Sequence, residues 1–461
     1  MNAGDPGAPA AAGPAAGAGD GAAPGERPLK RPRRLQTPTR AALLDHFARS
    51  QATARAVLAV ELLLVVLVTG WWLAGDRRIA GWQAAAYFAA GCLGMFLLVI
   101  EGWFADRVPL ERLPADRRFG LHTRDSLLAL LRRVQERLGC ADRPLRVFMG
   151  RGKDVNAFAQ RFELLPGVGS RNGVQLDRAM VHLLDEAELA SVIGHELGHV
   201  HAHAPLVTRC LLVHALAAGA LSLLGAELLP FGHLSLGLPL LALWLVRTVA
   251  YSMHTTQVRA VEFLCDDVGA RAAGLLPAAR AELKIALERE TRSALLLRVL
   301  EAKRTHSHLP IEQLLADWEA ALPFGRVDAV QARAELERNL RRRLADEAKG
   351  TLSGLWSHIW GADDTDDAAL DQQLARGRTL QQIRRVPIPF AELLANPDRL
   401  TRPALGALAD SVEALPDHLL FRLDDEVDDS AETHPCPSRR VLFLWRHASE
   451  YPDAAERAGR R

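Results

Sequence analysis

The sequence predicts a mainly α-helical protein with a small β-sheet and two hydrophobic helical hairpins. Hydrophobic residues make up 49% of the 461 residues, and they gather in four segments near the length that crosses a bilayer. Around residues 189 to 200 apolar side chains recur every three to four positions, which is the periodicity of a buried helix. A short apolar run at 145 to 149 and a glycine-interrupted segment after residue 156 indicate a strand and a hairpin.

Charge and cysteine content narrow the class of protein. The net charge is +1, from 56 basic and 55 acidic residues, so no global field indicates a nucleic acid as partner. The five cysteines are scattered without a CxxC pair, which indicates neither a disulfide framework nor a thiolate zinc site. Reduced thiols in a cytosol-facing protein fit this pattern.

Residues 1 to 50 are expected to form a disordered basic tail. They are rich in alanine, glycine and proline and hold too few large apolar residues to offset the entropy lost on ordering. The basic cluster at 27 to 34 (RPLKRPRR) has two interpretations, a nucleic-acid or localisation patch and a cytoplasmic anchor. Its position just ahead of a hydrophobic segment favours the anchor.

Residues 51 to 105 are expected to form a transmembrane hairpin with spans at 56 to 75 and 79 to 100. Tryptophans mark the edges of both spans, where amphipathic aromatic side chains favour the headgroup region. A cleaved signal peptide would be shorter and would start closer to Met1. Lysine and arginine dominate before the first span, so both ends of the hairpin, and the segments that follow, are expected in the cytoplasm.

Residues 106 to 205 are expected to form the first half of a soluble domain, with an amphipathic helix at 127 to 138. Within it, Asn156, Ala157 and Phe158 are candidates for an exposed sheet edge. Such an edge can accept a peptide as an added strand. The alternative interpretation is an ordinary loop and strand.

A helix expected from about residue 185 carries His195-Glu196-Leu197-Gly198-His199, a match to HExxH. Two imidazoles one turn apart lie on the same helix face and can bind one metal ion. Glu196 is placed to hold and deprotonate a water molecule on that ion without being a ligand. The residues indicate a zinc site for hydrolysis, and the alternative is a core helix with two hydrogen-bonded histidines.

Neighbouring residues refine this interpretation. Gly194 and Gly198 each cost about 1 kcal/mol of helix propensity relative to alanine, which is easier to understand if another backbone passes close by. His201 faces away from His199 and is expected not to bind metal. His203, one turn further on, is a candidate wall residue.

Residues 206 to 252 are expected to form a second hydrophobic hairpin, with apolar segments at 207 to 229 and 234 to 251. Arg209, His214 and Glu227 interrupt the first segment, so two buried helices of a soluble domain remain the alternative. If both segments span, the chain returns to the cytoplasm.

Residues 253 to 350 are expected to be helical and to supply the third ligand, because a catalytic zinc keeps three protein ligands. Glu262 is the candidate. Arg259, Glu262 and Asp266 share one helix face at spacings of three and four, and Asp266 is placed to accept a hydrogen bond from a ligating imidazole. The alternative is a surface ion pair between Arg259 and Glu262.

With these residues in place, the chain resembles the integral-membrane zinc metalloproteases of the HtpX and CAAX prenyl protease type, which are HExxH gluzincins. The shared features occur in the same order: two amino-terminal spans, NAFA at 156 to 159, HELGH at 195 to 199, a hydrophobic hairpin, and the RxxExxxD run that ends at Asp266. The resemblance implies one Zn²⁺ per chain with Glu262 as third ligand. It also implies an integral protein of the bacterial inner (plasma) membrane whose catalytic domain faces the cytoplasm.

The same resemblance covers a late His-Pro pair followed by an arginine, matched by His434 and Arg440 in the expected carboxy-terminal part, residues 351 to 461. It implies that these two residues assist the substrate or the oxyanion of the tetrahedral intermediate. The alternative is a capped helix start in an accessory segment. The chain departs from the common pattern at Gln257, Val258 and Cys265, which puts fine specificity in doubt more than metal binding.

The sequence therefore predicts a membrane-embedded zinc endopeptidase that hydrolyses membrane or misfolded proteins, with lipid and protein substrate as its partners. One alternative is a non-catalytic membrane scaffold or regulator that retains the fold, and another is a protease that processes prenylated peptides. A third is a small transport protein in which Glu61, Arg209 and His214 line a path.

Overall fold

The computed structural model of the protein describes residues 38 to 75, 78 to 100, 107 to 150, 155 to 162, 171 to 206, 210 to 228, 237 to 286, 400 to 414 and 437 to 451, with isolated positions elsewhere. The expected tail up to residue 37 and the segment that holds Arg209 lie outside these residues. So does most of the stretch from 351 to 461.

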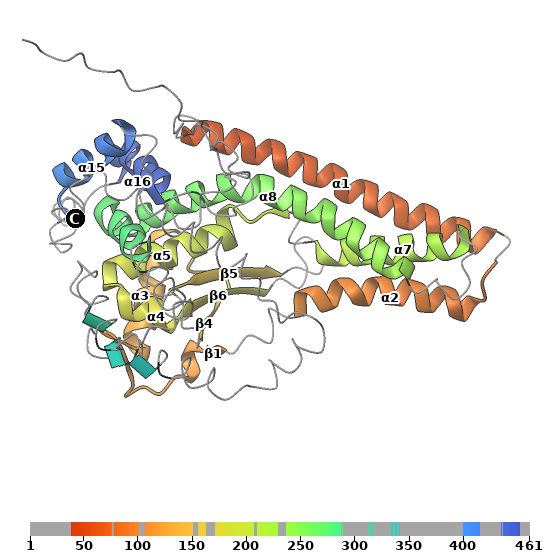
Figure 1. Cartoon of the computed structure of the whole chain (residues 1–461), viewed down its shortest axis with the longest axis horizontal. Helices are drawn as coiled ribbons and strands as arrows, with labels where there is room; N and C mark the ends of the chain where they lie inside the picture. The colour runs from red at the N-terminus through yellow and green to blue at the C-terminus, as the bar shows by residue number, and fades with distance from the viewer. Residues whose placement is uncertain are drawn as a thin grey trace, which may run out of the picture. The chain divides into compact units, whose positions relative to one another are not determined.

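Two apolar helical hairpins pack together at one end of the fold (Figure 1). Their helices are α1 (Arg40–Ala74), α2 (Gly81–Ile100), α7 (Leu211–Leu228) and the first part of α8 (Gly237–Ala273). By length and composition, α1 and α7 can cross a membrane, and 237 to 252 forms a shorter apolar helix. The predicted mainly helical fold with two hydrophobic hairpins is confirmed.

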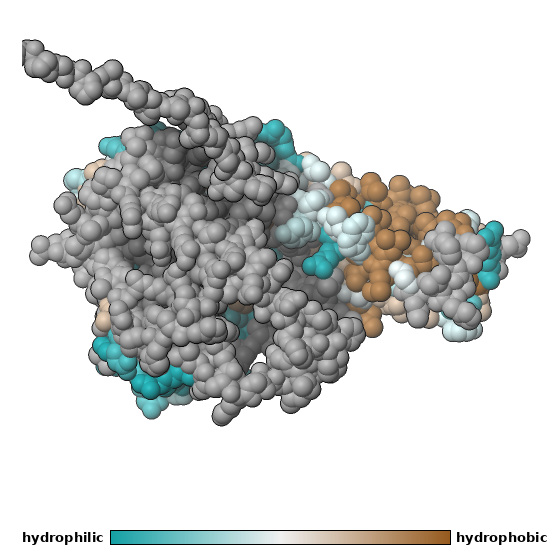
Figure 2. Space-filling view, in the orientation of Figure 1, coloured by the Kyte–Doolittle hydropathy of each residue, from teal (hydrophilic) through white to brown (hydrophobic). Residues whose placement is uncertain are grey.

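Small residues let α2 and α7 approach closely. A Cβ on Gly91 would lie 2.6 Å from the carbonyl oxygen of Ala218, and one on Gly219 would lie 2.8 Å from that of Phe88. Helix contacts in membranes favour such residues because dispersion forces replace the hydrophobic effect there. Large apolar side chains instead face outward from α1 and α8, and Figure 2 shows them as a brown surface over these helices.

Both long helices extend beyond the apolar part. The helix α1 begins at Arg40, where the Thr39 hydroxyl accepts a 3.3 Å hydrogen bond from the Ala42 amide, so it starts within the segment expected to be a disordered tail up to residue 50. The helix α8 runs without a break through residue 252, where the sequence predicted a boundary. The second arm of this hairpin and the third-ligand segment are therefore one helix.

The second part of the fold contains a four-stranded sheet. Its strands are β1 (Arg107–Pro109), β4 (Arg146–Gly150), β6 (Arg171–Asp177) and β5 (Ala157–Phe162), in that spatial order. The pair β4 and β6 is parallel and the other pairs are antiparallel, so β5 and β6 form the expected hairpin. Among the described residues, β5 is an edge strand that pairs only with β6.

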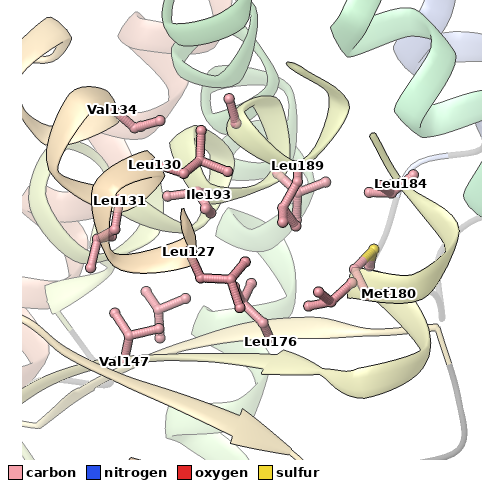
Figure 3. Close-up of a cluster of buried hydrophobic side chains, with 14 of the residues drawn as sticks. Leu127, Leu130, Leu131, Val134, Val147, Leu176, Met180, Leu184, Leu189 and Ile193 are labelled. Carbon is pink, nitrogen blue, oxygen red and sulfur yellow. The ribbon is translucent and has the colours of Figure 1, made fainter. Parts of the chain in front are cut away.

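The main hydrophobic core lies between one face of this sheet and three helices, α3 (Arg124–Arg137), α4 (Arg178–Leu183) and α5 (Glu186–Leu197). Thr123 begins α3 with a capping box in which its hydroxyl accepts from the Ser126 amide. Figure 3 shows the side chains that fill the layer, among them Leu127, Leu130, Val147, Leu176, Leu189 and Ile193. This packing fixes α5 against the sheet.

A second core cluster joins α15 (Arg402–Ala414) and α16 (Pro437–Arg446) to the helical stretch 275 to 286 that follows α8. Leu275, Leu405 and Val441 are completely buried in it. The carboxy-terminal segment is thereby held against the far end of α8.

Candidate metal centre

The helix α5 carries the HExxH residues and is anchored at its start. Asp185 and Glu188 form a capping box, in which the Asp185 carboxylate accepts from the Glu188 amide at 2.8 Å and the Glu188 carboxylate accepts from the Asp185 amide at 2.9 Å. Glu188 is completely buried and pairs with Lys284 at 2.8 Å. From Gly198 to Ala202 the chain continues as a π-helix, which the sequence periodicity did not predict and which is frequent at functional sites.

Glycines allow α5 and α8 to cross in close contact. A Cβ on Gly194 would lie 3.0 Å from Gly269 Cα, and one on Gly269 would lie 2.7 Å from the Ser191 carbonyl oxygen. A Cβ on Gly198 would lie 3.2 Å from Cys265 Cα. The backbone that the glycines predicted is therefore that of α8, and it brings the third-ligand candidate to the histidines.

His195, His199 and Glu262 converge, with one possible ligand atom from each lying within 4.8 Å of the others. The two Nε2 atoms are 3.1 Å apart, and the Glu262 carboxylate oxygens lie 3.4 Å from His195 Nε2 and 3.3 Å from His199 Nε2. Ligands of a tetrahedral zinc with bonds of about 2.0 to 2.1 Å are about 3.3 Å apart. The donor set and its spacing fit one zinc ion. Glu262 is 2% exposed, so it lies in the interior and not on a solvated charged face.

Asp266 holds the far side of the His195 ring. Its Oδ1 lies 2.9 Å from His195 Nδ1, so the Nε2 atom of that ring faces His199 and Glu262. Arg440 of α16 donates to both Asp266 oxygens, with Nε at 2.8 Å from Oδ2, and pairs through Nη1 with Glu282 at 2.8 Å. A carboxylate behind a ligating imidazole fixes its tautomer and orientation.

These contacts shift the protonation of the metal-free site. Burial lowers the pKa of His195, but hydrogen bonds to Asp266 and Glu262 outweigh it and raise that pKa from 6.5 to about 10. Burial raises the pKa of Asp266, but the Arg440 guanidinium outweighs it and holds this pKa below its usual value.

Glu196 follows the first histidine in the last turn of α5 and is 5% exposed. Its carboxylate contributes to the negative field around Cys265, whose thiol pKa is raised well above its usual value, first by burial and then by the nearby carboxylates. Cys265 is therefore a neutral thiol that packs against Gly198.

The other two histidines of this segment lie away from the three-residue cluster. Burial lowers the pKa of both His201 and His203 to about 4, so both are neutral at pH 7. The His203 ring packs edge-on against Phe47 of α1, with ring centroids 5.7 Å apart. His203 thus links the segment after α5 to α1.

The candidate sheet edge lies beside α5 and the π-helix. Ala157 and Phe158 begin β5, and the carbonyl oxygen of Asn156 accepts from the Asp177 amide at 3.0 Å. Arg161 of the same strand donates to the Val200 carbonyl oxygen of the π-helix. The edge strand is therefore joined directly to the segment that carries His199.

One predicted residue lies outside the described part of the chain, and one residue in contact with the site was not predicted. His434 lies outside the described residues. Glu282 was not a sequence candidate, since one acidic residue in a charge-rich helical segment gives no signal, yet it is a partner of Arg440.

Comparison with known proteins agrees with this geometry. The model of peptidase family M48 matches residues 122–446. A protease HtpX homolog from Bifidobacterium longum (strain NCC 2705) is 24% identical over 180 residues, which is 39% of this chain and 53% of that relative. The match thus spans about half the length of the relative. No solved structure gives a significant match. Because the family model covers most of the chain and confirms the resemblance drawn from its motifs, the protein belongs to peptidase family M48.

Proposed function

We propose that this M48 peptidase is a membrane-embedded zinc endopeptidase. The observation that carries the proposal is the convergence of His195, His199 and Glu262 at spacings that suit tetrahedral zinc. When bound, zinc supplies Lewis acidity, which acidifies a water molecule and polarises the scissile carbonyl. His195, His199 and Glu262 would hold the ion.

Glu196 is the general base in this proposal. It lies one residue after His195 on a helix whose side chains are mostly buried, and its own side chain is 5% exposed. It takes the proton of the attacking water and delivers it to the amine of the leaving peptide. Asp266 orients His195 for this step, and Arg440 orients Asp266.

The substrate enters as an extended chain along β5. Within the described part of the chain β5 pairs only with β6, it contacts α5, and Asn156, Ala157 and Phe158 lie where the strand begins. Main-chain hydrogen bonds to an edge strand accept many sequences, which suits loosely folded substrates. Membrane and misfolded proteins are the proposed substrate class.

The apolar hairpins hold the enzyme in the bacterial inner membrane, with the zinc site on the cytoplasmic side. Support comes from α1, where Arg40, Arg49 and Arg55 precede the apolar stretch at the end nearest the catalytic half. Basic residues concentrate on the cytoplasmic side of a span.

The test compares the parent protein with Glu196→Gln and His199→Ala, each purified in lipid nanodiscs. The parent is expected to hold about one zinc per chain and to cleave casein, a loosely folded protein. Glu196→Gln should keep the zinc and lose cleavage by about 10²- to 10⁴-fold, while His199→Ala should lose both.

Unchanged cleavage by Glu196→Gln contradicts the mechanism. Zinc without cleavage in the parent indicates the scaffold. Cleavage of prenylated peptides but not of casein indicates the processing protease.

A further inference from the structure

We propose that α8 fixes the height of the metal centre above the membrane, so that the enzyme cleaves only bonds at least about five residues beyond the end of a substrate's membrane span. This limit rests on the proposed endopeptidase function and defines its substrate class as extended juxtamembrane segments.

One helix carries both the membrane surface and the zinc ligand. Along α8, Leu240, Trp244 and Tyr251 expose 68%, 61% and 56% of their surface. Beyond them the same helix turns inward, with Gln257 at 1% and Glu262 at 2%. Because α8 is unbroken from Gly237 to Ala273, the two parts keep a fixed separation.

The helix α1 gives a second, independent measure of the boundary. It runs antiparallel to α8 (Figure 1), and Arg40 pairs with Asp267 while the Ser50 carbonyl oxygen accepts from Gln257 at 3.3 Å. Both contacts give the same antiparallel register of the two helices, in which Tyr251 of α8 lies opposite residue 56 of α1. The apolar stretch of α1 starts there, directly after the exposed Arg55. Two helices thus set the membrane boundary at one level.

The height of the metal centre follows from this level. Glu262 lies eleven residues beyond Tyr251 on α8. At about 1.5 Å of rise per helical residue, the ligand stands about 16 Å above the boundary. An extended chain covers about 3.3 Å per residue, so a substrate needs about five residues to reach the site from the end of its own span.

Contacts of α8 around Asp267 and Gly269 keep the distance between the metal centre and the membrane boundary from changing. Asp267 accepts from the Tyr451 hydroxyl at 2.7 Å and from Arg271 at 2.9 Å, and it also pairs with Arg40 at the start of α1. The glycine crossing at Gly194 and Gly269 holds α5 against the same helix. The metal centre cannot approach the bilayer without breaking both sets of contacts.

The main experiment uses zinc-loaded parent enzyme in liposomes with reporter substrates that share one apolar span and one cleavage sequence taken from a protein that the enzyme cuts. Glycine-serine spacers of two, four, six and ten residues separate the two, and residues removed from the spacer are added after the cleavage sequence to keep the length constant. The control is the same cleavage sequence in a peptide without a span.

We expect cleavage of the two-residue substrate to be at least about tenfold slower than that of the ten-residue substrate, with the rise between four and six, since about five extended residues span the gap. Equal rates for all four spacers, together with cleavage of the spanless peptide, overturn the limit and leave the endopeptidase function standing. No cleavage of the spanless peptide overturns both.

A depth measurement tests the height without activity. Nitroxide side chains are placed at Val60, Arg49 and Asp45, which lie on the exposed surface of α1, with Asp45 level with Glu262. In liposomes the probe at Val60 should be relaxed by oxygen, and the probes at Arg49 and Asp45 by a water-soluble nickel complex. A probe at Asp45 that reports lipid overturns the proposed height.

Discussion

At the level of single residues, Arg440 contacts the candidate metal centre through Asp266, which in turn contacts His195. Its guanidinium lies between Asp266 and Glu282 and its side chain is 13% exposed, so it is the shared counter-charge of two carboxylates. The resemblance implied a role with the substrate or the oxyanion, whereas the contacts indicate a positioning role behind His195. The two roles predict different kinetics.

We expect Arg440→Ala to weaken zinc affinity by about 10- to 100-fold, because Asp266 then no longer fixes the His195 ring. Competition with a chelator measures the affinity, and activity should return when zinc is in excess. The zinc affinity of Arg440→Lys should fall between those of the parent and Arg440→Ala, since lysine keeps the positive charge but lacks the forked geometry of the guanidinium. Arg446→Ala, on the same helix in an exposed pair with Glu413, is the control. Unchanged affinity with a lower kcat would instead assign Arg440 to the oxyanion.

The raised pKa of His195 predicts that zinc competes with a proton. At pH 7 the metal-free ring is an imidazolium, since hydrogen bonds to Asp266 and Glu262 hold its pKa at about 10 against the opposing effect of burial. Titration calorimetry in two buffers of different ionisation heat should therefore show about one proton released per zinc. The Asp266→Asn variant should release fewer protons per zinc. If the parent released no proton, the raised pKa of His195 would be contradicted.

The same shift predicts how the stability of the metal-free protein depends on pH. Because the folded pKa of His195 is raised, its stabilising contribution is present in full below the unfolded value of 6.5 and is lost as pH rises through about 10. Chelator-treated protein should thus melt at a lower temperature at pH 10 than at pH 7, and zinc should remove most of the difference. Equal melting temperatures at the two pH values would contradict it.

At the level of elements, the crossing of α5 and α8 builds the site. Gly269→Ala should push the helices apart, because its new Cβ would meet the Ser191 carbonyl oxygen at 2.7 Å and backbone cannot rotate away. We expect a loss of about 1 to 3 kcal/mol of stability and weaker zinc binding. Gly70→Ala in α1, with no atom within 4 Å of the new Cβ, is the matched control and should be neutral or stabilising. Parent-like zinc affinity in Gly269→Ala would show that the close crossing is not needed.

Local patterns predicted the elements that carry the chemistry, and tertiary contacts decided the rest. The spacing of His195 and His199, the cap at Asp185 and the glycines at 194 and 198 are all visible in the sequence because each acts within one or two helical turns. The continuity of α8 was missed, since hydropathy falls after residue 252 although the helix goes on. The partner of Arg440 was missed because it depends on how α16 docks.

At the level of the whole molecule, the apolar helical bundle and the part that holds the candidate metal centre share the two longest described helices. Both α1 and α8 pass from the apolar bundle to the candidate metal centre, and Leu43 of α1 packs with Phe263 and Leu264 of α8 next to the candidate ligand Glu262. No hinge separates the parts within these two helices. Substitutions that destabilise the helical bundle should therefore also disturb the candidate metal centre. The buried pair between α1 and α7 allows a direct test.

Glu61 of α1 and His214 of α7 form that pair, with Oε2 to Nδ1 at 2.8 Å and side chains that are 10% and 3% exposed. Breaking a buried pair leaves one polar group without its partner and costs about 3 to 5 kcal/mol, whereas replacing both members with apolar residues is often neutral. We expect Glu61→Leu and His214→Leu each to lower the thermal stability of the protein in nanodiscs. The double variant should recover most of the loss and keep its zinc.

This series also separates a structural pair from a transport path. If Glu61 and His214 carried ions across the membrane, vesicles with the parent protein would show a flux that the double variant lacks. If they hold α1 against α7, the double variant keeps peptidase activity because the zinc site depends on helix position and not on these two charges. Two single variants as stable as the parent would contradict the structural role, and a double variant no better than the sum of the singles would show that the bundle needs the polar contact itself.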